Sequence, residues 1–116
     1  MYKTRRIMEI KSRLWIEKEG KPFIGFGRIN LLKQVDETAS ISAAAKALKM
    51  SYKKAWNLLN EIETLAEQPV LVKNIGGKNG GGTQVTDYGK SLILQFETLN
   101  QNCINFLEAE YKKLEL

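Results

Sequence analysis

The sequence contains no histidine, a single cysteine and two prolines among its 116 residues. Without histidine, the usual general base and most metal sites are missing, and Cys103 alone makes a poor nucleophile constellation. One cysteine forms no disulfide within the chain, which fits a reducing compartment. No apolar run approaches the roughly 18 residues that cross a bilayer. These absences argue against an enzyme, a metal protein or a membrane protein, so we expect no cofactor and a cytoplasmic location.

Positive charge is the first feature that points to a partner. The chain carries 18 Lys and Arg against 13 Asp and Glu, a formal net charge of +5. The excess is uneven, since residues 1–33 hold nine basic and three acidic residues, whereas residues 91–116 hold two basic and four acidic residues. A basic balance favours polyanionic partners, nucleic acid first and an anionic membrane second.

The first part of the chain changes from strand periodicity to helix periodicity. Alternating apolar residues over 8–16 predict a strand, a turn at 19–20 follows, and residues 21–24 predict a short return strand. Helical spacing begins at Phe26, and Ala39 lies at the end of this first helix. The apolar positions of the first helix are Phe26, Ile29, Leu32 and Val35, with Leu31 beside them.

Two further helices joined by a tight turn are predicted next. Ser40 is a good N-cap for the first of them, and Ser51 for the second, which we expect to end near Glu67 before Pro69. The apolar positions are Ile41, Ala44, Ala45 and Leu48 in one helix and Ala55, Leu58, Leu59, Ile62, Leu65 and Ala66 in the other.

A glycine-rich stretch, IGGKNGGGT at residues 75–83, separates two short predicted strands at 70–75 and 83–85. It is not a Walker phosphate loop, because Val72 and Gln84 stand where the two possible registers require glycine. Its place between two strands therefore predicts a hairpin tip. The alternative is a plain flexible turn without a binding role.

A long final helix begins after Thr86, which is a good N-cap, and Asp87 suits its positive end. Apolar residues recur along it with spacings of 4, 3, 4 and 3, which is typical of a short coiled-coil-like seam. The seam consists of Leu92, Phe96, Leu99, Cys103 and Phe106.

The order of these elements predicts a fold that is mainly α with a small amount of β structure, a winged helix-turn-helix. We place it in one domain over residues 1–116, with an N-terminal hairpin. The helix-turn-helix spans about 40–67, the wing about 70–85 and the C-terminal helix about 87–112. The helix that starts after Ser51 would enter a major groove of duplex DNA.

The candidate DNA-binding residues are polar or basic and follow the helix starts and the wing. They are Ser42, Ser51, Tyr52, Lys53, Lys54, Asn57, Lys73, Lys78 and Asn79. An asparagine such as Asn57 pairs bidentately with adenine, and helix N-termini bind phosphate. Alternatives stay open: Lys53, Lys54 and Asn57 also suit a solvated face, Tyr52 suits either role, and Trp56 reads as a packing residue. A basic face could instead dock an acidic protein or RNA.

Two segments carry a resemblance to a known family. The stretch SISAAAKALKMSYKKAW, followed by the GGKNGGG wing, resembles the N-terminal domain of ModE-type regulators, which are molybdate-responsive transcription factors. The resemblance covers about residues 10–110. It implies a LysR-like winged helix that forms a homodimer through its long flanking helices, with the Leu92–Phe106 seam as part of the interface.

Two-fold symmetry of such a dimer would require a near-palindromic double-stranded DNA site. The resemblance places Ser51, Tyr52, Lys53, Lys54 and Asn57 on the recognition helix. It places Lys78 and Asn79 at the wing tip. The family's molybdate-binding domains are not present in this sequence, so molybdate binding is not expected. Family members often have glycine where Ala39 stands here. A left-handed backbone at that position would add modest strain to alanine.

Overall fold

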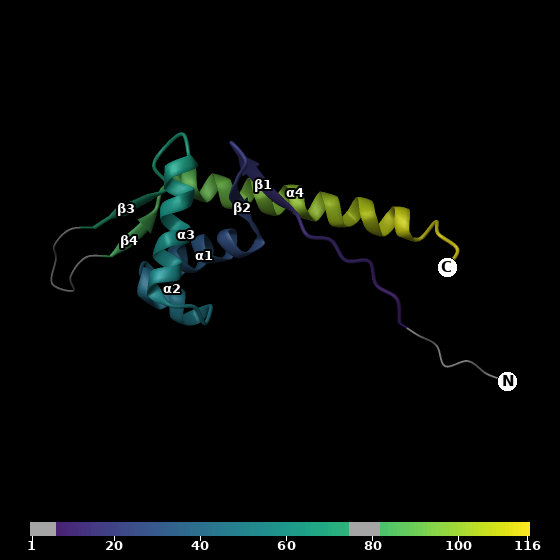
Figure 1. Cartoon of the computed structure of the whole chain (residues 1–116), viewed down its shortest axis with the longest axis horizontal. Coiled ribbons are helices and arrows are strands. Elements are labelled where there is room, and N and C mark those ends of the chain that lie inside the picture. The colour runs from purple at the N-terminus through teal and green to yellow at the C-terminus, as the bar shows by residue number, and fades with distance from the viewer. Residues whose placement is uncertain (1–6, 75–81) are drawn as a thin grey trace.

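The computed structural model describes residues 7–74 and 82–116. Its elements are, in chain order, β1 (Trp15–Lys18), β2 (Lys21–Gly25), α1 (Phe26–Thr38), α2 (Ile41–Ala47), α3 (Tyr52–Leu65), β3 (Leu71–Lys73), β4 (Thr83–Val85) and α4 (Asp87–Tyr111). The strands form two separate antiparallel hairpins, β1–β2 and β3–β4. Helices α1–α3 and the hairpins form a globule from which α4 extends to one side (Figure 1). The predicted mainly helical winged-helix fold is confirmed.

The core lies where α1, α2 and α3 meet the start of α4. Apolar residues at helical spacing form the buried face of each helix, and their burial supplies most of the helices' stability. The most deeply buried members are Leu31, Leu32, Val35, Ala44, Ala55 and Ile62. Ala44 and Ala55 have no exposed surface. Phe26 was expected on this face, but it is 68% exposed, because it begins α1 ahead of the turn that faces the core.

The helix boundaries follow the predicted caps. Ser40 Oγ accepts a hydrogen bond from Ala43 N at 3.0 Å, and Ser51 Oγ accepts one from Lys54 N at 3.1 Å. Each serine thereby satisfies one free N–H group of its helix. Ala39 ends α1 with φ 56°, the left-handed conformation in which alanine is strained by roughly 1–2 kcal/mol.

The N-terminal strand begins later than its sequence pattern predicts. Residues 8–14 alternate like a strand, but regular pairing starts at Trp15, because β2 offers only five residues before α1 begins. The preceding residues run beside the far half of α4 instead (Figure 1). Ile10 and Ser12 line a shallow cleft there with Ile104 and Leu107. Another boundary also differs, since α3 ends at Leu65 and not near Glu67.

The junction between the wing hairpin and α4 is held by Thr86. Its hydroxyl donates to the Pro69 carbonyl oxygen at 2.7 Å and accepts from Gly89 N at 3.0 Å. Its backbone N–H donates to the Val70 carbonyl at 2.9 Å. One residue thus caps α4 and ties it to the loop that leads into β3.

Gly89 allows α4 to approach this junction closely, and replacing it tests that packing. A Cβ at Gly89 would lie 2.6 Å from Val85 Cγ1 and 2.7 Å from the Val70 carbonyl oxygen. We expect Gly89→Ala to lower the free energy of unfolding by about 1–3 kcal/mol through overpacking, measured by urea denaturation. The control is Gly27→Ala in α1, where a Cβ meets nothing within 4 Å. Equal stability of the two variants would contradict the close packing.

Candidate nucleic-acid interface

Helix α3 presents a polar stripe on the side opposite its buried face. Ala55, Leu59 and Ile62 pack into the core, whereas Lys53 and Asn57 are exposed one turn apart on the other side. Because residues four apart lie on one face of a helix, these two side chains point outward together. The remaining predicted contacts at Ser42, Ser51, Tyr52 and Lys54 are also exposed. The structure therefore leaves this group of residues accessible at the α2–α3 end of the globule.

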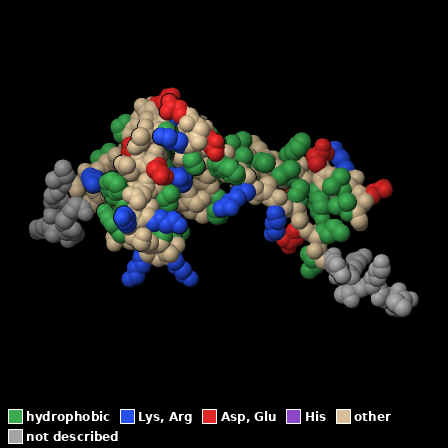
Figure 2. All heavy atoms as spheres, viewed as in Figure 1, with side chains coloured by type: hydrophobic (Ala, Val, Ile, Leu, Met, Phe, Trp, Pro, Cys, Tyr) green, Lys and Arg blue, Asp and Glu red, His purple; other side chains and the backbone are tan. Residues whose placement is uncertain are grey.

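Charge on this face is strongly one-sided. Residues 38–60 contain four lysines and no acidic residue, a signal that sequence inspection could have used. The six ion pairs between described residues all lie elsewhere in the chain. The four lysines, none of which joins those pairs, are Lys46, Lys49, Lys53 and Lys54. Figure 2 shows basic side chains projecting from the lower end of the globule, where Figure 1 places α2. Such a surface attracts polyanions.

Outside this face, two basic side chains form ion pairs between helices. Arg28 Nη1 lies 2.7 Å from Glu61 Oε2 and joins α1 to α3. Lys33 Nζ donates to Glu97 Oε2 at 2.7 Å and joins α1 to α4. That hydrogen bond and the Glu97 charge raise the pKa of Lys33. Arg28 and Lys33 therefore have acidic partners among the described residues, unlike the four lysines of residues 38–60.

The wing hairpin is fixed to the helices at its base. The Glu63 carboxylate, near the end of α3, accepts hydrogen bonds from the backbone N–H groups of Val70 and Leu71. On the other strand, Thr83 N donates to the Ala39 carbonyl oxygen at 2.9 Å. The base of the wing is therefore tied to α3 and to the α1–α2 turn. Sequence reasoning missed Glu63, because nothing in the local pattern distinguishes it from other surface acids.

Lys73 is exposed at the end of β3, opposite Thr83 in the hairpin register. The other predicted wing residues, Lys78 and Asn79, lie outside the described residues, as does most of the glycine-rich stretch. Their role stays a prediction.

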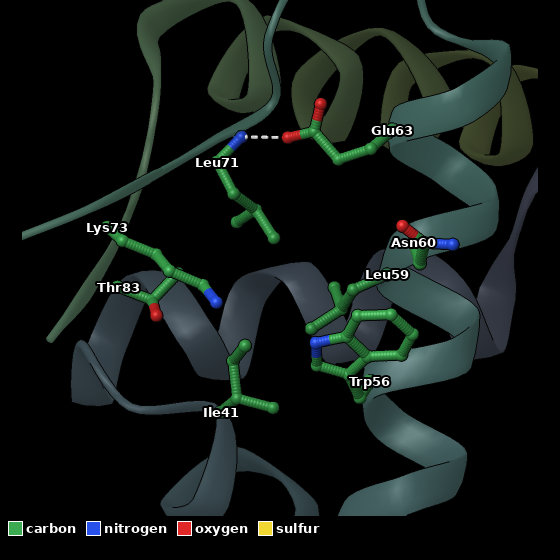
Figure 3. Close-up of a pocket in the computed structure, with 8 residues that line it drawn as sticks. All are labelled: Ile41, Trp56, Leu59, Asn60, Glu63, Leu71, Lys73 and Thr83. Atoms are coloured by element: carbon green, nitrogen blue, oxygen red, sulfur yellow. Dashed lines mark hydrogen bonds between the residues drawn. The ribbon is translucent and has the colours of Figure 1, made fainter.

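A cleft of about 220 Å³ separates α3 from the wing. Trp56 lines it and is 41% exposed, so the interpretation of this residue as a packing side chain is incomplete. Figure 3 shows the indole facing a space bordered by α2 and by the wing strands. The residues that line the cleft are Ile41, Trp56, Leu59, Asn60, Glu63, Leu71, Lys73 and Thr83.

The predicted seam on α4 divides into two parts. Leu92 and Phe96 are buried in the core of the single chain, so they are not free to contact a partner. Leu99 and Phe106, farther along, are 44% and 64% exposed, and Cys103 between them is half-buried. The seam expectation is thus corrected for its first two residues, since the periodicity did not distinguish core contacts from a free face.

The far half of α4 extends beyond the globule, and the N-terminal run around Ile10 and Ser12 lies beside it. The radius of gyration is 18.5 Å, whereas a compact chain of this length has about 13 Å.

No helix within the described ranges is long and apolar enough to span a bilayer. Among the same residues, no cluster of three or more acidic or cysteine side chains is placed to hold a metal ion.

Comparison with known proteins gives a consistent set of relatives, although no protein-family model matches the chain. The chain is 39% identical over 111 residues to the "Transcriptional regulator ModE" of Yersinia pestis, covering 93% of this chain and 42% of that protein. It is 40% identical over 88 residues to the Haemophilus influenzae protein of the same name, covering 76% and 34%. The "Molybdenum transport protein ModE" of Azotobacter vinelandii is 42% identical over 72 residues, covering 62% and 27%.

The chain spans about a third of the length of these curated relatives. Among solved structures, a LysR family transcriptional regulator matches with a TM-score of 0.55 and 17% identity. The match covers 74% of this chain and 28% of that protein. At this identity the likeness supports the fold, and the resemblance to ModE-type proteins rests on the sequence relatives.

Proposed function

From the similarity of this chain to the ModE transcriptional regulators, we propose that it is a sequence-specific DNA-binding transcription regulator acting in the cytoplasm. The observation that carries the proposal is the stretch of residues 38–60, which has four lysines and no acidic residue. Two of these lysines, Lys53 and Lys54, are exposed in the first turn of α3, which Ser51 caps. In this proposal α3 enters the major groove. Lys53 and Lys54 contact phosphates or bases, and Asn57 reads a base edge.

The second part of the proposal is a homodimer joined through α4. Leu99 and Phe106 are exposed apolar side chains seven residues apart, on one face of the half of α4 that projects from the globule. Contact with a second copy would remove these side chains from water. A two-fold dimer would present two copies of α3 and therefore bind a near-palindromic DNA site.

Enrichment of bound duplexes from a random pool tests both parts together. We expect an inverted repeat whose half-sites are separated by about one helical turn, roughly 34–36 Å, or a multiple of it. An unrepeated half-site would contradict the dimer alone. Absence of enrichment, with no retardation of random duplex at low salt, would contradict DNA binding and favour a module that docks an acidic protein or RNA.

A further inference from the structure

The cleft between α3 and the wing contains a hydrogen-bond donor that the fold leaves unused. The indole of Trp56 is 41% exposed, and its N–H makes no hydrogen bond to any described residue. The chain's other tryptophan, Trp15, donates its N–H to Glu17 Oε2 at 2.9 Å. Figure 3 shows the Trp56 ring nitrogen on the side of the indole that faces the cleft.

A cation faces this indole from the opposite wall. Lys73 lines the same cleft from β3, and Figure 3 shows its ammonium group directed into the space towards α3. It takes part in none of the ion pairs between described residues. An apolar ring face, an N–H donor and an ammonium group together match a sugar with an attached phosphate.

The one acidic group in the cleft lies away from these groups. Glu63 is seven residues beyond Trp56 on α3, a rise of about 10 Å along the helix. Its carboxylate already accepts hydrogen bonds from Val70 N and Leu71 N, so it is committed to anchoring the wing. The Trp56 end of the cleft is therefore the end suited to an anion.

The size of the cleft narrows the choice of occupant. Its volume of about 220 Å³ is below the roughly 300–1,000 Å³ of typical small-molecule sites. Trp56, one turn beyond the start of α3, marks the end of the cleft nearer the exposed lysines. The cleft lies between α3 and the wing, two elements that would flank one DNA strand in the proposed docking. One segment of a DNA sugar–phosphate backbone, lying across the cleft, fits this position better than an enclosed small molecule.

We infer that the cleft holds one sugar–phosphate backbone of the bound duplex. The Trp56 indole packs against a deoxyribose, and its N–H donates to the phosphate that the Lys73 ammonium neutralises. This inference rests on the proposed DNA-binding function and adds a contact that fixes the register of α3 on the duplex. It assigns Trp56 a binding role in addition to its packing against the helices.

The presence of two tryptophans allows a direct test by fluorescence. In Trp15→Phe, Trp56 is the sole tryptophan emitter, and in Trp56→Phe only Trp15 remains. Each variant is titrated with random-sequence duplex at low salt, because backbone contacts do not depend on sequence. Binding is followed independently by the anisotropy of labelled DNA, and folding by circular dichroism.

We expect DNA to reduce acrylamide quenching of Trp56 in Trp15→Phe by at least about twofold, and to leave Trp15 unchanged in Trp56→Phe. Loss of the indole N–H in Trp56→Phe should weaken binding roughly tenfold, as for a charged hydrogen bond. Normal binding with unchanged Trp56 quenching would overturn the inference and leave the proposed function intact. Failure of folded Trp15→Phe to bind DNA would overturn both.

Discussion

Replacing Lys53 and Lys54 together with alanine will weaken binding to duplex DNA by roughly 30-fold or more and flatten its dependence on salt. Both side chains are exposed at the start of α3, in a stretch without acidic residues. Each phosphate contact that is lost should lower the slope of log affinity against log salt by about 0.9. If the protein binds as the proposed dimer, four such contacts are lost, and the slope should be smaller by about 3 to 4.

The matched control is Lys112→Ala with Lys113→Ala at the far end of the chain. Both variants remove two positive charges, so a purely global charge effect would weaken binding equally in each. We expect the control to keep most of the affinity and nearly the whole salt slope, measured by fluorescence anisotropy at several salt concentrations. Equal losses in the two variants, or an unchanged slope in the first, would show that the α3 lysines do not contact DNA.

Replacing Leu99 and Phe106 with glutamate will convert the proposed dimer into a folded monomer. Both side chains are exposed on the projecting half of α4, whereas Leu92 and Phe96 on the same seam hold the core. Burying the new carboxylates in an apolar interface costs about 3 kcal/mol or more, which corresponds to roughly 100-fold weaker association. Sedimentation equilibrium measures this change, and circular dichroism shows whether the globule remains folded.

Thr98→Glu with Asn105→Glu provides the matched control for the dimer variant. These two exposed residues are seven residues apart, like Leu99 and Phe106, but they lie about a quarter turn away around α4. The control adds the same charge to the same helix, and we expect it to remain dimeric. Dissociation of both variants would indicate that added charge destabilises α4 itself, and a dimer that persists in Leu99→Glu/Phe106→Glu would contradict this interface.

Helix caps and apolar periodicity, which depend on residues close together in the chain, predicted most of the helices and strands. Ser40, Ser51 and Thr86 each precede a helix and cap it with a side-chain oxygen, so the helix starts were predictable from hydroxyl residues ahead of apolar periodicity. The order of helices and strands then indicated a winged helix. The exposed α3 lysines followed from the same periodicity, because the apolar stripe fixes which side of a helix faces the core.

The two predictions that the structure corrected, the strand at 8–14 and the continuous α4 seam, depend on contacts between separate elements. Residues 8–14 carry a strand pattern, but a strand requires a partner, and β2 is too short to supply one. In the same way, the α4 seam is continuous in sequence, yet the globule ends beside Phe96 and leaves Leu99 outside. Periodicity identifies an apolar face and does not identify what covers it.

The sequence by itself therefore determined the fold class, the capped helix starts and the basic face of α3, since each depends on interactions between residues close together in the chain. Only the tertiary structure decided how the wing is anchored by Glu63, how α4 is divided at Phe96 and why Trp56 faces a cleft shared with Lys73. Those features join residues from separate elements, and their positions are fixed by packing between elements rather than by local spacing.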